Sequence, residues 1–527
     1  MINSSYLNAK STTGTNLRVR DASALSGMCP ICIYECATMC QISLAALRGR
    51  EALYPMPKYF GFSTAAALKD FGIDWSHFNL LSTVRGAYGI DEDPDKMLFP
   101  NVSTETSVGG VRLKVPIMMG AYGSTDVARI FWESLATGAA LSGIAIIVGE
   151  NVCGVDPESV ISGGKVAHSK EMERRIKLYR EYWDGKYGDI IVQTNVEDQR
   201  LGVDVYVISK LEVNCIERKW GQGAKAIGGE IRVKDIHRAV ELKKRGYLVL
   251  PDPEDPTVQE AYKLGAIKSF ERHSRVGSPK LTDFVEDVYK LREQGAKVVS
   301  IKTGNYRPID IAYTLKIGSE AKVDYITFDG AGGGTGMSPV PMMDEMGIPT
   351  IYMETIALRC VQVLSRKGKH IPDIVMAGGF IEETQILKAI ALSNFSNEPY
   401  VKAVVMGRAP ITAAMKTEYF SKLAKEGKLP KTIAEEYGAS PELFLANYTY
   451  IKNIAGRELP PGAVGVYNYM ERLRVGMQQL LAGIRKFQLN LINRNDLVAL
   501  TEIASRVTGI PMPHELDREA IETILDY

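Results

Sequence analysis

Short apolar, β-branched runs alternate with amphipathic stretches from Val115 onward. This alternation is typical of repeated strand–helix units, which build a parallel sheet covered by helices. We count eight candidate strands, and eight is the number that closes a barrel of this kind. The pattern therefore predicts an α/β fold, a (β/α)8 TIM barrel. The candidate strands are residues 115–119, 144–148, 189–193, 214–220, 297–303, 324–329, 373–378 and 402–407.

The pattern changes at both ends of the predicted barrel. Residues 1–60 begin with a polar stretch without apolar periodicity and contain a cysteine cluster, and we treat them as a separate N-terminal segment. The barrel is expected over residues 61–415, and residues 416–527 indicate a helical extension. Between the fourth and fifth candidate strands lie 76 residues with a proline-rich stretch at 250–256, which predicts an insertion or lid.

The composition excludes several classes of protein. With 63 basic and 62 acidic residues among 527, the chain has no global field that attracts nucleic acid or an anionic membrane, and we find no local basic patch. Its longest apolar stretch, residues 139–149, is shorter than the roughly 18 residues of a spanning helix. The N-terminal residues lack the apolar core of a secretory signal, so we expect a cytoplasmic protein with reduced thiols.

Glycine-rich, polar segments follow most of the candidate strands. In a parallel barrel the carboxyl ends of all strands lie at one mouth, where active sites form. Because glycine lets the backbone approach a ligand closely, this mouth is expected to hold a large, phosphate-bearing ligand; the alternative is that these glycines only end the strands. The turns at Gly378-Gly379 and Gly407-Arg408 follow the seventh and eighth strands, where barrels often bind phosphate. Arg408 would add a charge-assisted bond, or pair with an acidic neighbour.

The residues of this mouth favour flavin mononucleotide over other nucleotides. The glycine-dense loop that begins at Asp329 has no Walker ending and opens no Rossmann unit. Lys302, at the end of the fifth strand, would stabilise the charge of a reduced flavin, or would pair with Asp329 or Glu217. The predicted cofactor-binding residues are Gly120, Ala121, Gln193, Lys302, Asp329, Gly330, Gly333, Gly334, Gly378, Gly379, Gly407 and Arg408.

Four of the seven cysteines form a cluster near the N-terminus. Their spacing supplies four soft thiolates within twelve residues, which suits an iron–sulfur cluster or tetrahedral zinc. A flavin without its own nicotinamide site needs an entry for electrons, which favours an iron–sulfur cluster, here of the 4Fe–4S type, over zinc. The predicted metal ligands are Cys29, Cys32, Cys36 and Cys40.

An ordered set of motifs resembles the FMN-binding synthase domain of glutamate synthase. The set consists of Gly149-Glu150, Lys219, Gln222-Gly-Ala-Lys225 with the following Gly228-Gly229, and the loop 333–339, and the similarity spans residues 115–510. The resemblance implies that 2-oxoglutarate and ammonia condense to 2-iminoglutarate, which a hydride from reduced FMN converts to glutamate. It also implies that Glu150, Lys219, Gln222 and Lys225 carry the catalysis, the alternative for each being a structural ion pair at the barrel mouth.

The chain departs from that family in ways that leave other functions open. Ala331-Gly332 replaces a His-Asp pair, no amidotransferase nucleophile precedes the barrel, and no cysteine cluster follows it. We therefore expect free ammonia or ammonia from a partner, electrons from a ferredoxin or a reductase subunit, and leave a homo-oligomer open. One alternative is an enzyme that acts on another amino or keto acid, for example in N-methylglutamate formation. Another is a non-catalytic scaffold subunit that binds zinc.

Overall fold

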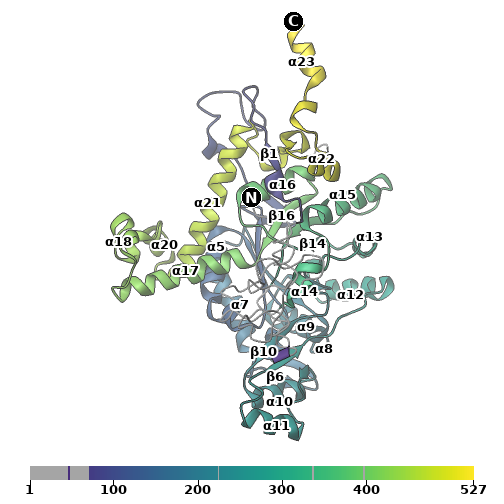
Figure 1. The fold of residues 1–527 in the computed structure, drawn as a ribbon, viewed down its shortest axis with the longest axis vertical. Coiled ribbons are helices and arrows are strands. Elements are labelled where there is room, and N and C mark those ends of the chain that lie inside the picture. Colours follow the sequence, from purple (N-terminus) through teal and green to yellow (C-terminus); the bar gives the residue numbers. More distant parts are fainter. Residues whose placement is uncertain (1–45, 48–70, 224, 335–337, 396–397, 527) are drawn as a thin grey trace, which may run out of the picture.

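The computed structural model describes residues 46–47, 71–223, 225–334, 338–395 and 398–526. Within them, eight parallel strands close into a barrel, which confirms the predicted TIM-barrel fold (Figure 1). The strands are β4 (Ile117–Tyr122), β5 (Ala145–Val148), β8 (Ile190–Thr194), β9 (Cys215–Lys219), β13 (Val298–Thr303), β14 (Tyr325–Asp329), β15 (Asp373–Ala377) and β16 (Val401–Met406). Each of them falls on a candidate strand of the sequence pattern.

The strands are apolar on both faces because one face lines the barrel and the other supports the surrounding helices. In β5, every residue from Ala145 to Val148 is fully buried. The first and last strands pair in parallel, with Val404 opposite Ile117, so the sheet has no free edge. Strand β4 is longer than the sequence pattern indicated and continues through Gly120 and Ala121, which we expected in the following loop.

A hairpin closes the barrel at the amino ends of its strands. It consists of β2 (Thr106–Val108) and β3 (Val111–Leu113), which pair antiparallel. Its apolar side chains belong to the same buried cluster as the interior of the barrel. The backbone N–H of Gly109 donates to the Asp373 carboxylate at 2.8 Å, and this bond holds the hairpin to the start of β15. The opposite, carboxyl-end mouth is therefore the one left for a site.

Helices surround the barrel on all sides. Each follows a strand and packs an apolar face against it, as the alternating pattern predicted. The covering helices are α5 (Trp132–Ser142), α7 (Lys170–Arg180), α9 (Val203–Leu211), α12 (Leu281–Glu293), α13 (Pro308–Glu320), α15 (Thr350–Arg366), α16 (Glu383–Leu392) and α17 (Arg408–Lys425).

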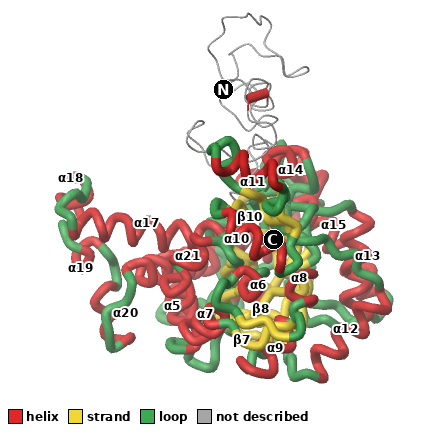
Figure 2. Tube along the Cα trace, turned by 90° about the horizontal axis from the view of Figure 1, so that it is seen from below, coloured by secondary structure: helices red, strands yellow, loops and turns green. Residues whose placement is uncertain are grey.

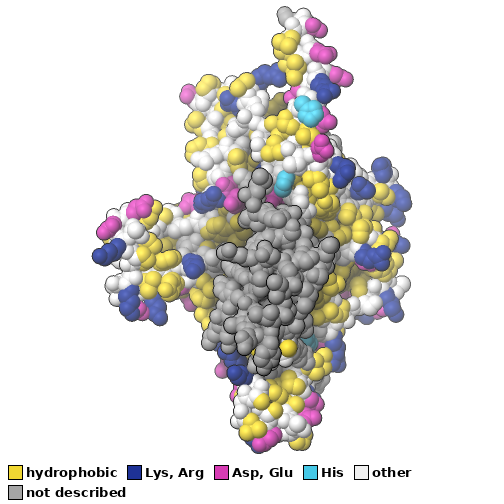
Figure 3. Space-filling view, in the orientation of Figure 1, with side chains coloured by type: hydrophobic (Ala, Val, Ile, Leu, Met, Phe, Trp, Pro, Cys, Tyr) yellow, Lys and Arg dark blue, Asp and Glu magenta, His cyan; other side chains and the backbone are white. Residues whose placement is uncertain are grey.

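The C-terminal residues are anchored to the barrel by one long helix. Helix α21 (Pro461–Gly483) packs against α5 and α17. The intervening helices α18 (Lys431–Tyr437), α19 (Pro441–Phe444) and α20 (Tyr448–Ala455) project sideways, as Figure 2 shows from below. Figure 3 shows apolar side chains on this projecting part and on the terminal helix α23 (Arg518–Leu525).

The C-terminal part of the chain also contains short extended and helical elements. Strand β17 (Leu497–Ala499) pairs antiparallel with β1 (Phe78–Leu80), so a segment before the barrel and a segment after it lie side by side. Helix α22 (Glu502–Thr508) follows. In the part of the chain that the structure describes, no helix combines the length and the apolar character that crossing a membrane requires.

The predicted insertion is a small α/β unit after β9. It contains β10 (Glu230–Val233), α10 (Ile236–Lys244), β11 (Leu248–Leu250), α11 (Pro256–Lys263) and β12 (Phe270–His273). The strands form an antiparallel sheet in the order β10-β12-β11, and the unit has its own apolar cluster around Phe270 and Leu242. Because β9 ends at the mouth of the barrel, the insertion begins and ends at that mouth.

Candidate active site

The residues predicted for the site come together at the carboxyl-end mouth. Lys219 and Asp329 are the last residues of β9 and β14, and Lys302 lies one residue before the end of β13. Gln193 lies near the end of β8. The parallel barrel brings these strand ends to one mouth although more than a hundred residues separate some of them.

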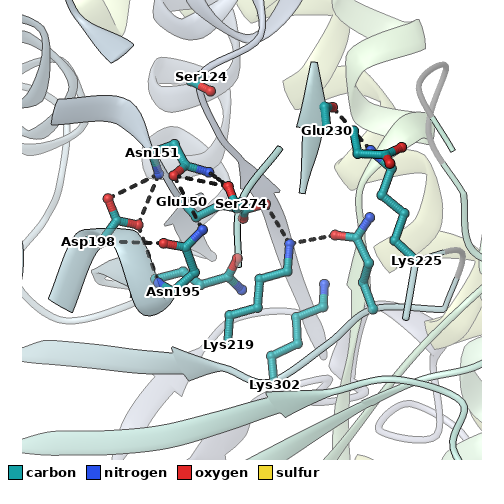
Figure 4. Close-up of polar contacts among 12 residues, drawn as sticks. Ser124, Glu150, Asn151, Asn195, Asp198, Lys219, Lys225, Glu230, Ser274 and Lys302 are labelled. Atoms are coloured by element: carbon teal, nitrogen blue, oxygen red, sulfur yellow. Dashed lines mark hydrogen bonds and ion pairs between the residues drawn. The ribbon is translucent and has the colours of Figure 1, made fainter. Parts of the chain in front are cut away.

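Glu150, Lys219 and Gln222 form one hydrogen-bonded chain, and Figure 4 shows Lys219 pointing toward Glu150. The Lys219 ammonium donates to Glu150 Oε1 at 2.7 Å and to Gln222 Oε1 at 2.5 Å. Burial opposes the charge of the Glu150 carboxylate, but the Lys219 ammonium and its hydrogen bond lower the Glu150 pKa to about 2. Glu150 is therefore ionised at neutral pH. An ionised carboxylate can orient a cation, but it has no proton to donate.

Lys225 is a second buried cation at this mouth. Its ammonium donates to the backbone carbonyl of Glu230 at 3.1 Å, and it is 5% exposed. Burial lowers its pKa to about 8, although the neighbouring Glu230 carboxylate acts in the opposite direction. An amine with such a pKa exchanges a proton readily near neutral pH.

Lys302 and Glu217 lie deeper in the barrel. Lys302 Nζ is 3.5 Å from the Asp329 carboxylate, so the predicted alternative of an ion pair is present in this structure. Burial opposes its charge, but Asp329 and Glu217 raise the Lys302 pKa. Glu217 accepts a hydrogen bond from Gln193 Nε2 at 2.6 Å, and burial raises the pKa of this carboxyl.

The glycine turns at the ends of β15 and β16 lie where a phosphate would bind in such a barrel. Gly378 and Gly379 adopt φ of 107° and 98°, which L side chains rarely reach. A Cβ on Gly378 would lie 2.8 Å from Gly330 N and from Thr350 Oγ1, whereas a Cβ on Gly379 would meet its nearest neighbour at an ordinary contact distance of 3.8 Å. Gly407 precedes α17, an 18-residue helix whose first N–H groups favour an anion. Arg408 does not pair with an acidic side chain in the described residues, and it donates to the carbonyl of Gly332 at 3.4 Å.

The residues present fit a flavin mononucleotide. Gln193 Oε1 is buried without a hydrogen-bond partner among the described residues, as expected for a group that a ligand completes. A cation at Lys302 and glycine turns beside a helix N-terminus supply the ring and phosphate contacts that such a ligand needs. Gly330 lies against Thr350, where a Cβ would come within 2.2 Å of Thr350 Oγ1, so this glycine serves close packing rather than the ligand. Gly333 and Gly334 lie in the following loop.

The sequence did not single out a polar network that holds the Glu150 turn. Asn151 has a left-handed backbone with φ of 65°, and its N–H donates to both oxygens of the Asp198 carboxylate. Burial raises the Asp198 pKa to about 7, although the backbone N–H groups of Asn151 and Asn195 favour its charged form. Asn151 Nδ2 also donates to Ser274 Oγ at 3.1 Å. The only sequence signal for this network is that Asn151 directly follows Glu150.

The predicted metal ligands Cys29, Cys32, Cys36 and Cys40 lie outside the described residues, so the cluster remains a prediction. Within the described residues no group of histidine, cysteine and acidic side chains has the arrangement of a metal site. Cys153 is buried, and burial raises the pKa of its thiol, as expected for a structural cysteine. Cys215 is buried in the barrel, and Cys360 is partly buried on α15.

The Ala331-Gly332 loop, where the chain departs from the glutamate synthase pattern, packs against the Gly378-Gly379 turn. Ala331 is 1% exposed. A Cβ on Gly332 would lie 2.7 Å from the Gly378 carbonyl oxygen. The backbone of Gly378 therefore occupies the space that a side chain at position 332 would need.

Comparison with known proteins supports the family suggested by the motifs. The family model described as the conserved region in glutamate synthase matches residues 265–406. The archaeal-type glutamate synthase [NADPH] of Thermotoga neapolitana is 27% identical over 416 residues, which cover 74% of this chain and 68% of that protein. The glutamate synthase large subunit-like protein of Rhizobium meliloti is 25% identical over 423 residues, or 76% of this chain and 78% of that protein.

Among solved structures, a flavocytochrome b2 variant with sulfite bound matches 84% of this chain and 80% of its own, with a TM-score of 0.46 and 14% identity. The similarity to glutamate synthase rests on the sequence comparisons and on the motifs that meet at the barrel mouth. Over residues 265–406 this chain is similar to the conserved region in glutamate synthase, and over about three quarters of its length it is similar to a glutamate synthase of Thermotoga neapolitana.

Proposed function

We propose that this chain is an FMN-dependent oxidoreductase that reduces 2-iminoglutarate, formed from 2-oxoglutarate and ammonia, to glutamate. The observation that carries the proposal is the chain of Glu150, Lys219 and Gln222 at the same barrel mouth as the glycine turns and Lys302. The name of the Thermotoga neapolitana relative, a glutamate synthase, supports the same activity.

The buried cations at the mouth would bind and prepare the substrate. Lys219 presents its ammonium beside Glu150, which fixes its direction, and would hold a carboxylate or the carbonyl oxygen of the keto acid. Lys225, with its pKa of about 8, would give up or take the proton that moves as ammonia replaces the carbonyl oxygen and water leaves. The insertion beside Lys225 would limit access of water to the imine.

FMN bound at the glycine turns would supply the hydride that reduces the imine carbon. Gly378, Gly379 and the N-terminus of α17 would hold its phosphate, and the Lys302 ammonium would stabilise the negative charge of the reduced ring. The unpaired Oε1 of Gln193 would accept a hydrogen bond from a donor of the ligand. Electrons would enter through an iron–sulfur cluster on Cys29, Cys32, Cys36 and Cys40 from a ferredoxin or a reductase subunit.

A second candidate substrate is an alkylamine in place of ammonia. The observation that favours it is that Gly332, in the loop beside the mouth, has no side chain and packs its backbone against Gly378. Methylamine and 2-oxoglutarate would then give N-methylglutamate by the same hydride transfer.

One experiment separates these candidates. The anaerobically purified protein, with a chemical reductant, is given 2-oxoglutarate and equal amounts of ¹⁵N-ammonium and methylamine, and the products are identified by mass spectrometry. Labelled glutamate supports the first proposal, and N-methylglutamate supports the second. FMN-containing protein that forms neither product would overturn both.

A further inference from the structure

His273, the last residue of strand β12, lies between two buried carboxylates of the insertion and has no role in the site described above. Its Nδ1 is 3.0 Å from Glu230 Oε1, and its Nε2 is 3.2 Å from Glu271 Oε2. Both glutamates are buried. They raise the His273 pKa to about 9, although burial opposes its charge, so the ring is an imidazolium at neutral pH.

The Glu230 carboxylate depends on this histidine. Glu230 begins β10 and lies directly opposite His273 in the antiparallel pair of β10 and β12. Apart from the ion pair with His273, neither of its carboxylate oxygens has a hydrogen-bond partner among the described residues. A buried carboxylate without a compensating charge is costly, so the imidazolium holds this side chain in place.

Glu230 connects His273 to Lys225. Its backbone carbonyl accepts a hydrogen bond from the Lys225 ammonium at 3.1 Å, and Figure 4 shows the Lys225 side chain directed toward Glu230. Burial lowers the Lys225 pKa to about 8, and the Glu230 carboxylate acts against this effect by favouring the charged amine. A change in the charge around Glu230 therefore reaches the amine that exchanges a proton in the proposed reaction.

The other charged groups around these residues leave the pair intact. Besides Glu230, the groups whose charge acts on Lys225 are Glu150, Lys219 and Arg272. Opposite His273, strand β11 contributes the apolar Leu248. Helix α10 also packs against β12, and there Arg238 pairs with Glu241 and Lys243 pairs with Asp252. Among the described residues that pack here, His273 is therefore the cation in ion-pair contact with Glu230.

We propose that His273 is a positioning residue for the reaction: its imidazolium pairs with the Glu230 carboxylate, and this pair fixes both the carbonyl that holds the Lys225 ammonium and the charge that the ammonium faces. The insertion thereby sets the pH range in which Lys225 carries its proton. The inference rests on the proposed function, because it concerns the lysine that moves a proton in that reaction.

The test measures how the affinity for 2-oxoglutarate depends on pH. The full-length protein as purified is titrated by calorimetry with 2-oxoglutarate from about pH 6 to about pH 10, on both sides of the Lys225 pKa of about 8. Binding of this dianion is expected to weaken as Lys225 loses its proton. Lys225→Gln should lose this pH dependence, which identifies Lys225 as its source.

Two single variants are expected to move the midpoint of this pH dependence in opposite directions. His273→Gln leaves the Glu230 charge uncompensated, which favours protonated Lys225, so the midpoint should rise by about one pH unit. Glu230→Gln removes the negative charge, so the midpoint should fall by about one pH unit. The double variant Glu230→Gln/His273→Gln removes one charge of each sign and should return the midpoint close to that of the wild-type protein.

His237→Gln is the matched control, because His237 is an exposed histidine on α10 of the same insertion, and it should keep the wild-type midpoint. Single variants that keep the wild-type midpoint, or that both shift it in the same direction, would overturn the proposal. So would a wild-type affinity that does not change with pH, a result that needs no variant to fold. Glutamate formation is assayed separately: protein that shows the opposite shifts but forms no glutamate would support this role of His273 and contradict the proposed function.

Discussion

Both oxygens of the Asp198 carboxylate accept the backbone N–H of Asn151, at 2.9 and 3.2 Å. This contact holds Asn151 in its left-handed conformation and so sets the direction of the preceding Glu150. Asp198 lies on the short helix α8 (Val196–Arg200), at the end of another barrel strand. A buried carboxyl that makes no hydrogen bond to Lys219 thus supports the geometry of the Glu150–Lys219 pair.

Replacing Asp198 is expected to change how stability depends on pH. Burial raises the Asp198 pKa from 3.8 to about 7, so the folded state binds the proton more strongly than the unfolded state. The contribution of the carboxyl to the free energy of unfolding is therefore largest below about pH 4 and falls as the pH rises to about 7. The measurement is denaturant unfolding of the wild-type protein and Asp198→Asn between these limits. A stability difference that stays constant with pH would contradict the account.

Removing the charge of Glu150 is expected to reduce turnover more than stability. In Glu150→Gln, Lys219 loses the carboxylate that fixes its direction, and we expect the turnover number to fall by about a hundredfold or more. The measurement is glutamate formation under anaerobic conditions, with circular dichroism as the check of folding. Glu158→Gln, which removes an exposed carboxylate, should retain wild-type turnover. Equal turnover in the two variants would show that Glu150 has only a structural role.

Lys302→Met is expected to weaken the binding of FMN. The substitution removes the buried cation beside Asp329 and leaves negative charge where the reduced ring would lie, so we expect the dissociation constant to rise by about tenfold or more. Quenching of flavin fluorescence measures this constant directly. Lys316→Met, at an exposed position on α13, is the control. Unchanged affinity and unchanged flavin reduction in Lys302→Met would remove Lys302 from the site.

The proposed metal site on the N-terminal cysteine cluster can be tested independently of the barrel. Replacing Cys29, Cys32 or Cys36 by Ala should abolish the broad visible absorbance of an iron–sulfur cluster and leave the flavin bands unchanged. Iron and sulfide assays on anaerobic preparations measure the same loss. Cys360→Ala is the control, because Cys360 lies on α15 of the barrel. Stoichiometric zinc without iron in the wild-type protein would instead support a structural metal.

The sequence was sufficient to locate the barrel because its strands are buried on both faces. Such strands are short, continuous apolar runs, and the glycine-rich turns after them mark one mouth. The extra length of β4 was not predictable, because Gly120 and Ala121 resemble loop residues and form an irregularity in the strand between Met119 and Tyr122, which both pair with β5. The antiparallel sheet of the insertion was also not predicted, since its strands are short and interrupted by helices.

The candidate site was predictable only where a motif marked it. Glu150, Lys219 and Gln222 lie in motifs shared with a family, and the structure brings them into hydrogen-bond contact. Asp198 had no such signal, because a lone aspartate has no informative spacing in sequence. Its importance comes from burial and from contacts between segments far apart in the chain, which only the three-dimensional structure provides.

The central claim is that a reduced flavin in this barrel passes its electrons to an imine made from 2-oxoglutarate. The most direct test reduces the FMN-loaded protein chemically under anaerobic conditions, adds 2-oxoglutarate and ammonium, and follows the flavin absorbance and the amino acid formed. We predict that the flavin becomes oxidised only when both compounds are present, with one glutamate formed for each flavin. Protein that holds no FMN, or a reduced flavin that stays reduced with a keto acid and either ammonium or methylamine, would contradict the account.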